Sequence, residues 1–274
     1  MVRRQFGIEL EGYGMTTEQI RVAVLSVEGT VFVDNSHTHN GPTYFDGITW
    51  QVMADGSVNG PNNFELVSPV MKQQKHKDLA WKVIDAMLAA GAQVNRSAGL
   101  HVTFGCDNSR FRRLGAAKKG RVFKRLLETY SYFKGRGIDT ILAPSRRNGA
   151  YEGEQWAPDT YVNGSNLGRK SWDEAQWTEA SKGNYQFSKY ECINLSKMIR
   201  SQCIEFRQHQ GTFNSTKVLH WVRLLDALLS YTLNEEHAQK HCTDYHNGIV
   251  GMMDCVEVGV TTRRFFEARL QELA

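Results

Sequence analysis

Two glutamates in the first expected strand constrain the fold of the whole chain. The segment FGIELEGYG, residues 6–14, alternates apolar residues with Glu9 and Glu11. Because successive side chains of a strand point to opposite faces, the two glutamates share one face and Ile8 shares the other with Leu10. Burying adjacent carboxylates without partners costs on the order of several kcal/mol. The segment is therefore either an edge strand with its acids in water or part of a site for a hard cation.

Four later segments show the same pattern, and they favour the cation site. MADGSV ends an expected strand with Asp55, whereas FELVSP, GLHVTFG and IEFRQHQG each place polar residues on the face opposite large apolar ones. If the apolar faces pack into one core, the polar faces line one concavity. The candidate metal ligands on these faces are Glu9, Glu11, Asp55, Glu65, His101 and Glu205.

The composition of this ligand set indicates the kind of metal. Five carboxylates and one imidazole suit Mg²⁺ or Mn²⁺ better than zinc, which favours sulfur and nitrogen, and balancing the charge takes more than one ion. Arg207 lies on the same strand face as Glu205, and its guanidinium can bind a phosphate or carboxylate through two hydrogen bonds. The sequence therefore predicts a shared metal and phosphate site.

The overall composition is that of an ordinary globular protein. Of 274 residues, 41% are hydrophobic and 23% charged, and the net charge of +4 fits an anionic substrate as well as a nucleic-acid contact. The five cysteines form no C-x-x-C pair, so we expect free thiols and no structural zinc. The start lacks the apolar core of a signal peptide, and no stretch is long enough for a membrane span, so we expect a cytoplasmic protein without membrane contacts.

Periodicity and turn residues predict an α+β fold. Strands are expected at residues 6–14, 30–34, 48–55, 63–70, 99–105, 189–196 and 202–211. Helices are expected at 16–28, 77–91, 116–133, 217–234, 236–256 and 262–273, the fourth capped by Ser215 or Thr216. Residues 134–185 are rich in Gly, Asn, Ser and Trp and predict long functional loops. No composition shift marks a boundary, so residues 1–274 are expected to form one domain.

Two histidine-containing motifs fit a metal site less well. HTH at residues 37–39 lies in a polar loop, and HCTDYH at 241–246 spaces its side chains around a helix rather than along one face. A solvated loop and a solvated helix explain these motifs more simply.

The order of the motifs resembles the amidoligase family, relatives of glutamine synthetase and glutamate-cysteine ligase. FGIELEGYG, W-x-x-x-x-DGSV, FELVSP, GLHVTFG, INLS and IEFRQHQGTFN carry the resemblance over about residues 6–230. It implies a curved, mostly antiparallel sheet that forms a funnel like that of glutamine synthetase, with helices packed on its outer face. Residues 236–274 would form a C-terminal helical extension.

The resemblance also implies roles for single residues. Glu9, Glu11 and Glu205 look like metal ligands, joined by Asp55, Glu65 and His101. Arg207 looks like the residue that holds the terminal phosphate of ATP, and Asn194 looks like a nucleotide or metal contact. Arg146 or Arg147 would bind a substrate carboxylate or an acyl phosphate. One departure from the family is Thr103, which stands where G-x-H-V-H usually has its second histidine.

The implied reaction is ATP-dependent ligation of a carboxylate to an amine through an acyl phosphate, with Mg²⁺ or Mn²⁺. The amine is ammonia, an amino acid or a peptide, and Glu65 and Asp55 are candidates for the base that removes its proton. Three alternatives stay open: a guanidino-kinase-like phosphotransferase of the same fold, a catalytically inactive nucleotide-binding relative, and a two-metal nuclease. The nuclease is disfavoured because no basic groove is evident in the sequence.

Overall fold

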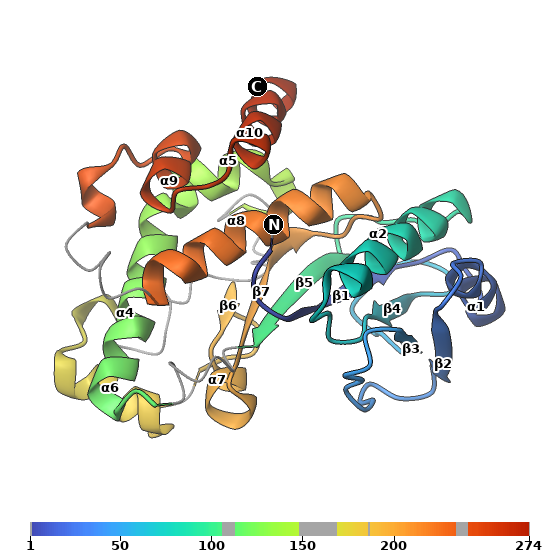
Figure 1. The fold of residues 1–274 in the computed structure, drawn as a ribbon, viewed down its shortest axis with the longest axis horizontal. Helices are drawn as coiled ribbons and strands as arrows, with labels where there is room; N and C mark the ends of the chain where they lie inside the picture. The colour runs from blue at the N-terminus through green and yellow to red at the C-terminus, as the bar shows by residue number, and fades with distance from the viewer. Residues whose placement is uncertain (1, 106–112, 148–168, 186, 234–240, 274) are drawn as a thin grey trace. The chain divides into compact units, whose positions relative to one another are not determined.

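The computed structural model describes residues 2–105, 113–147, 169–185, 187–233 and 241–273 (Figure 1). The chain divides into two compact units. The first, here called the sheet unit, comprises Arg3–Phe104 and His209–Trp221. The second, the helical unit, comprises Gly105–Gln208, Val222–Ala274 and the first two residues. The expectation of one domain stays a prediction.

The sheet unit is built on strands whose order differs from their order in the sequence. The strands are β1 (Phe6–Gly12), β2 (Val31–Asn35), β3 (Thr49–Met53), β4 (Phe64–Val67) and β5 (Gly99–Gly105). Their spatial order is β2-β3-β4-β1-β5. The β2–β3 pair is parallel and the other pairs are antiparallel. The predicted α+β class with a mostly antiparallel sheet is thus confirmed within this unit, whereas the funnel shape stays a prediction.

The core of the sheet unit follows the predicted alternation. In β1, Ile8 and Leu10 are buried, and they pair across the sheet with residues of β4 and β5 that are buried as well. Helices α1 (Thr17–Leu25) and α2 (Gln74–Ala89) lie beside the strands (Figure 1). Thr16 caps α1 in a capping box with Gln19, as an early Thr before an apolar helix predicts.

A glycine at the end of β1 admits an aromatic pair from two distant segments. A Cβ atom on Gly12 would lie 2.7 Å from the Phe213 ring and 2.9 Å from the Phe64 ring. The two rings pack with centroids 5.9 Å apart. Any larger residue would displace them, so Gly12 is required by close approach rather than by backbone conformation. This contact attaches the late segment His209–Trp221 to the sheet unit.

The helical unit contains most of the helices. They are α4 (Ala116–Phe133), the π-helix η1 (Lys134–Ile138), α5 (Asp139–Ile141), η2 (Pro144–Arg146), η3 (Arg169–Ser171), α6 (Glu174–Lys182), α7 (Ser196–Ser201), η5 (Cys242–Asp244), α9 (Ile249–Cys255) and α10 (Val260–Leu273). Strands β6 (Ile193–Asn194) and β7 (Cys203–Gln210) pair antiparallel, and α8 (Ser215–Leu233) begins in the sheet unit and ends here.

Four predictions about this region are wrong. The expected loops at 134–185 contain η1 and α6 in their described parts, and α6 has the capping box of Asp173 and Gln176 that marks a helix start. The strand expected at 189–196 is only two residues long, and α7 follows it. The cap of α8 is Asn214, whose Oδ1 accepts a hydrogen bond from the Lys217 amide at 2.9 Å. The helix expected at 236–256 is limited to Ile249–Cys255, after a short 3-10 turn, and residues 234–240 lie outside the described residues.

Two further features of the described residues are the state of the cysteines and the character of the helices. The cysteines within the described ranges, Cys192, Cys203, Cys242 and Cys255, are free thiols. Burial raises the pKa of the Cys242 thiol to about 11. In the described ranges, no helix combines the length and apolar character that crossing a membrane requires.

Candidate active site

The register of the central strand brings the predicted acids face to face. Glu11 of β1 stands directly opposite Glu65 of β4, and Glu9 stands directly opposite His101 of β5. Like charges placed opposite one another across an antiparallel pair destabilise the sheet. The Glu11–Glu65 pair is therefore a cost to the fold that calls for a compensating positive charge.

A third carboxylate joins this pair from the segment after β3. Glu11, Asp55 and Glu65 each offer one oxygen, and these atoms all lie within 4.8 Å of one another. The Oδ1 atom of Asp55 accepts hydrogen bonds from the amide and the hydroxyl of Ser57, both at 2.7 Å. The Oδ2 atom of Asp55 is buried without a hydrogen-bond partner. We refer to Glu11, Asp55 and Glu65 as the carboxylate cluster.

The carboxylate cluster fits a hard divalent cation. Its donors are all oxygens, the preferred ligands of Mg²⁺ and Mn²⁺. The buried, unpartnered oxygen of Asp55 supplies a ligand atom that nothing else in the described residues satisfies. Binding a cation would also relieve the repulsion between Glu11 and Glu65.

His101 lies between the two glutamates of β1. Its Nδ1 atom is 3.1 Å from Oε2 of Glu9, and its Nε2 atom is 3.3 Å from Oε1 of Glu11. The other oxygen of Glu11 accepts a hydrogen bond of 2.6 Å from the Gly99 amide. A protonated imidazole here offsets part of the negative charge, and a neutral imidazole offers one nitrogen to a metal. The sequence predicted that His101 lies on this face, but it did not predict the contacts of His101 with both glutamates.

Thr103 continues the polar face of β5 beyond His101. It pairs with Gly7 of β1, and its Oγ1 atom is buried without a hydrogen-bond partner. A buried hydroxyl without a partner costs roughly 1–3 kcal/mol, so its retention needs a reason other than stability. We expect the hydroxyl to contact a metal-bound water or the substrate.

Replacing Thr103 by valine tests this expectation, because valine keeps the shape and removes the hydroxyl. Thr103→Val should increase the free energy of unfolding by about 1 kcal/mol, since the unsatisfied group is lost. It should also lower affinity for Mg²⁺ or catalytic rate by about tenfold or more, as removal of a group outside the ligand shell does. Urea denaturation and magnesium titration measure the two effects. A variant that is less stable but fully active would show that the hydroxyl serves the fold.

Glu205 is surrounded by positive and amide groups in the helical unit. It is fully buried, and β6–β7 pairing sets it opposite Asn194, whose Nδ2 donates to Oε2 at 2.5 Å. The Oε1 atom accepts from Lys197 Nζ at 2.7 Å and from Arg207 Nη1 at 3.3 Å. Two other predicted site residues, Asn194 and Arg207, thus each contact Glu205. Whether Glu205 joins the acids of the sheet unit stays a prediction.

Lys197 is a member of this group that sequence reasoning missed. It lies in α7, directly after the INLS motif, and helix α7 turns its side chain back onto Glu205. The predicted strands 189–196 and 202–211 leave Lys197 between them, and the available signal is the polar start of the short segment SKMIRS, which forms α7. Lys197 and Arg207 together present two cations beside one carboxylate, which suits the binding of phosphate oxygens.

The opposite face of β7 buries Ile204 and Phe206, as expected, and also carries a buried polar network at Gln208. Gln208, fully buried, donates from Nε2 to Asp139 Oδ1 at 2.6 Å and to the Arg146 carbonyl at 3.2 Å. Its Oε1 accepts from the Tyr130 hydroxyl at 2.7 Å. Asp139 also pairs with the buried Lys134 at 3.3 Å. The network links the strand that bears Glu205 and Arg207 to the turn that bears Arg146.

The two predicted substrate arginines have different surroundings. Arg146 is buried within η2, at 4% exposure. The guanidinium of Arg147 donates to the Leu142 carbonyl at 2.9 and 3.1 Å, so it holds the turn closed. The rest of that loop, from residue 148 on, lies outside the described residues.

The fold and the carboxylate cluster define a mixed α+β protein with a candidate site for divalent cations. A family model described as "Putative amidoligase enzyme" matches residues 2–229, and the chain therefore belongs to this family. The predicted resemblance over residues 6–230 is confirmed, and the family indicates a ligase acting on carboxylate and amine substrates. A comparison with curated proteins finds no match.

Proposed function

We propose that the protein is an ATP-dependent carboxylate–amine ligase that works through an acyl phosphate. The observation that carries the proposal is the carboxylate cluster, with three oxygens within 4.8 Å of one another in a chain of the amidoligase family. The finer parts of the proposal are the use of ATP with Mg²⁺ or Mn²⁺ and a funnel-shaped sheet.

The chemistry explains why such a site needs so much charge. A carboxylate anion does not react with an amine, because oxide is a poor leaving group. Transfer of the terminal phosphoryl group of ATP to the carboxylate forms an acyl phosphate with a reactive carbonyl carbon. The amine nitrogen then bonds to that carbon, phosphate leaves with the bonding electrons, and the nitrogen loses its proton. When bound, a divalent cation neutralises charge on the phosphate oxygens.

The residues of the two units take separate roles in this scheme. Glu11, Asp55 and Glu65 would hold a cation, with Glu9 and His101 beside them. In the helical unit, Arg207 would bind the terminal phosphate, because its partly exposed guanidinium keeps donors available beyond Glu205. Electrostatic contacts of this kind typically contribute a few kcal/mol each to lowering the barrier.

Hydroxylamine supplies a direct test, since it attacks acyl phosphates and gives stable hydroxamates. The protein is incubated with ATP, MgCl₂, hydroxylamine and pooled carboxylic acids, and mass spectrometry detects a product equal to acid plus hydroxylamine minus water. We expect ADP, phosphate and a hydroxamate, all lost on addition of EDTA. Glu205→Gln is the control variant, and full activity in it would contradict the role of metal ligand that the family resemblance implies for Glu205.

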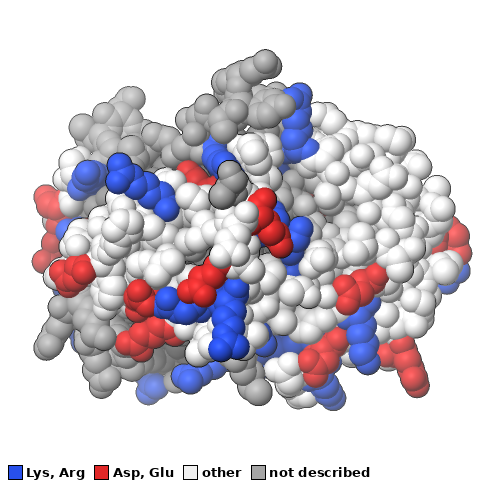
Figure 2. Space-filling view, turned by 90° about the horizontal axis from the view of Figure 1, so that it is seen from above, with Lys and Arg blue, Asp and Glu red and all other residues white. Residues whose placement is uncertain are grey.

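Other outcomes separate the alternatives. A stable phosphorylated product without hydroxamate would identify a phosphotransferase, and metal-dependent ATP binding without turnover an inactive relative. DNA cleavage with Mg²⁺ and no ATP would identify a nuclease. On the face drawn in Figure 2, Lys and Arg are interspersed with Asp and Glu rather than gathered into one basic patch, which does not favour the nuclease.

A further inference from the structure

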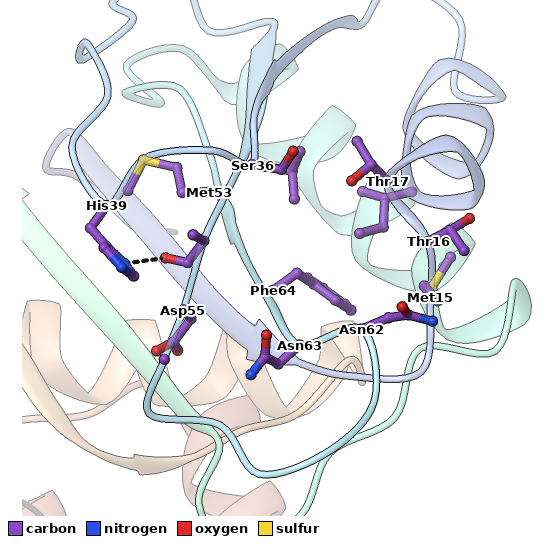
Figure 3. Close-up of a pocket in the computed structure, with 14 residues that line it drawn as sticks. Met15, Thr16, Thr17, Ser36, His39, Met53, Asp55, Asn62, Asn63 and Phe64 are labelled. Carbon is purple, nitrogen blue, oxygen red and sulfur yellow. Dashed lines mark hydrogen bonds between the residues drawn. The ribbon is translucent and has the colours of Figure 1, made fainter.

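A pocket of about 530 Å³ adjoins the carboxylate cluster within the sheet unit (Figure 3). The start of α1, the ends of β2 and β3, and the segment that leads into β4 form its walls. In Figure 3, Asp55 and His39 lie on the side opposite Thr16 and Thr17. The volume lies within the range of sites for small molecules.

The walls of the pocket are neutral apart from one acid and one histidine. Neutral polar residues, among them Thr17, Ser36 and Asn62, alternate with apolar ones such as Met15 and Phe64. No Lys or Arg is among the described residues that line it. A ligand with a negative charge therefore finds no counter-charge in these walls.

Asp55 belongs both to the pocket and to the carboxylate cluster. Asp55 is the one acid among the described residues that line the pocket, so its carboxylate makes this wall favourable to a positively charged ligand.

His39 adds a hydrogen-bond acceptor to the same side. Its Nδ1 atom lies 2.7 Å from the Ala54 carbonyl (Figure 3). A carbonyl only accepts, so Nδ1 carries the proton, and in the neutral ring Nε2 is left with a lone pair. The HTH motif, which fits a metal site less well than the strand acids do, thus contributes to the pocket through its second histidine.

We propose that this pocket binds the amine substrate of the ligase. The ligand class is a primary amine carried on an uncharged body with apolar and amide or hydroxyl groups, with its ammonium group toward Asp55. The inference rests on the proposed function only in that it calls the ligand a substrate. The preference of the pocket for an amine can be measured without catalysis.

Three ligands of matched length test the charge preference. They are 6-aminohexanamide, heptanamide and adipic acid monoamide, which differ at one end by an ammonium group, a methyl group and a carboxylate. Isothermal titration calorimetry with MgCl₂ and without ATP should show the amine binding at least about tenfold more tightly than the acid. Tighter binding of the acid would overturn the inference.

Variants at one position locate the binding. Thr17 lines the pocket at the first residue of α1, and Glu, Gln and Lys there have similar reach but different charge. Affinity for the amine should fall in the order Thr17→Glu, Thr17→Gln, Thr17→Lys, with about threefold or more per step. Gln74→Lys, on the exposed part of α2 outside the pocket, adds the same positive charge and should leave affinity unchanged. Thermal unfolding of each variant checks the fold.

Equal affinity in the three Thr17 variants would place the amine elsewhere and overturn the inference. The hydroxylamine assay on the unmodified protein keeps this result separate from the proposed function. Hydroxamate formation without a Thr17 effect refutes the pocket alone. A Thr17 effect without hydroxamate refutes the ligase and leaves an amine-binding pocket.

Discussion

Replacing Glu11 by glutamine is expected to reduce ligase activity by about 10²–10³-fold, the usual effect of removing one group that stabilises charge in the transition state. Glu11 is a buried member of the carboxylate cluster, opposite Glu65 and within 3.3 Å of His101. The substitution keeps the side-chain size and an oxygen that can accept from the Gly99 amide. It removes only the charge, so the loss is assigned to cation binding.

The same substitution should make the protein more stable when no divalent cation is present. Glu11→Gln removes one of two like charges that face each other across β1 and β4, an effect of roughly 0.2–1 kcal/mol. In the unmodified protein, MgCl₂ at 100 times its dissociation constant should add about 2.7 kcal/mol to the free energy of unfolding. In the variant this gain should disappear.

Urea denaturation with and without MgCl₂ measures both effects of Glu11→Gln. Glu28→Gln is the matched control, since Glu28 is exposed and lies outside the cluster. It should alter stability by less than about 0.5 kcal/mol. Retention of the full magnesium-dependent stabilisation by Glu11→Gln would show that the cluster does not bind the ion.

Replacing Gln208 by leucine is expected to lower the free energy of unfolding by roughly 3 kcal/mol or more. The change removes the hydrogen bonds that Gln208 makes, in a fully buried place, with the Tyr130 hydroxyl, Oδ1 of Asp139 and the Arg146 carbonyl. Each buried group deprived of its hydrogen bond costs about 1–3 kcal/mol. The apolar gain of leucine offsets only part of this sum.

Chemical denaturation of Gln208→Leu gives the size of the loss. Gln271→Leu, at an exposed position of α10, makes the same chemical change at a surface of the same unit and should have little effect. A Gln208→Leu variant as stable as the unmodified protein would mean that the network relaxes or admits water, so that Gln208 is not needed for the fold.

The sequence predicted Glu9, Glu11 and Glu65 because each lies on a strand whose side chains alternate between two faces, and it predicted Asp55 from its place just after such a strand. The alternation of Glu9 and Glu11 with Ile8 and Leu10 was sufficient to assign their faces, and the buried residues agree. The pairing of Glu11 with Glu65 was not predictable, because register depends on contacts between segments far apart in the chain. The structure alone supplies the distances within the cluster.

Three other features were not predicted, because the local sequence pattern indicates a different structure at each. Gln208 occupies the apolar face of β7, where periodicity predicts a hydrophobic residue, and only its partners from α4, α5 and η2 explain it. Helix α6 was missed because the segment around it is rich in Gly and Asn, which indicates loops, and the N-cap Asp173 was not recognised. Lys197 was missed because β6, with two residues, and α7, with six, are too short to show a periodic pattern in the sequence.

The attachment of Phe213 to Gly12 and Phe64 has a consequence for how the chain acquires its structure during translation. The sheet unit draws on Arg3–Phe104 and on His209–Trp221, so its aromatic contact is incomplete until the ribosome has released residues beyond 221. Roughly a hundred intervening residues emerge first. Until the segment His209–Trp221 is available, the nascent N-terminal strands expose apolar surface. Such exposure favours chaperone binding over autonomous folding of the first hundred residues.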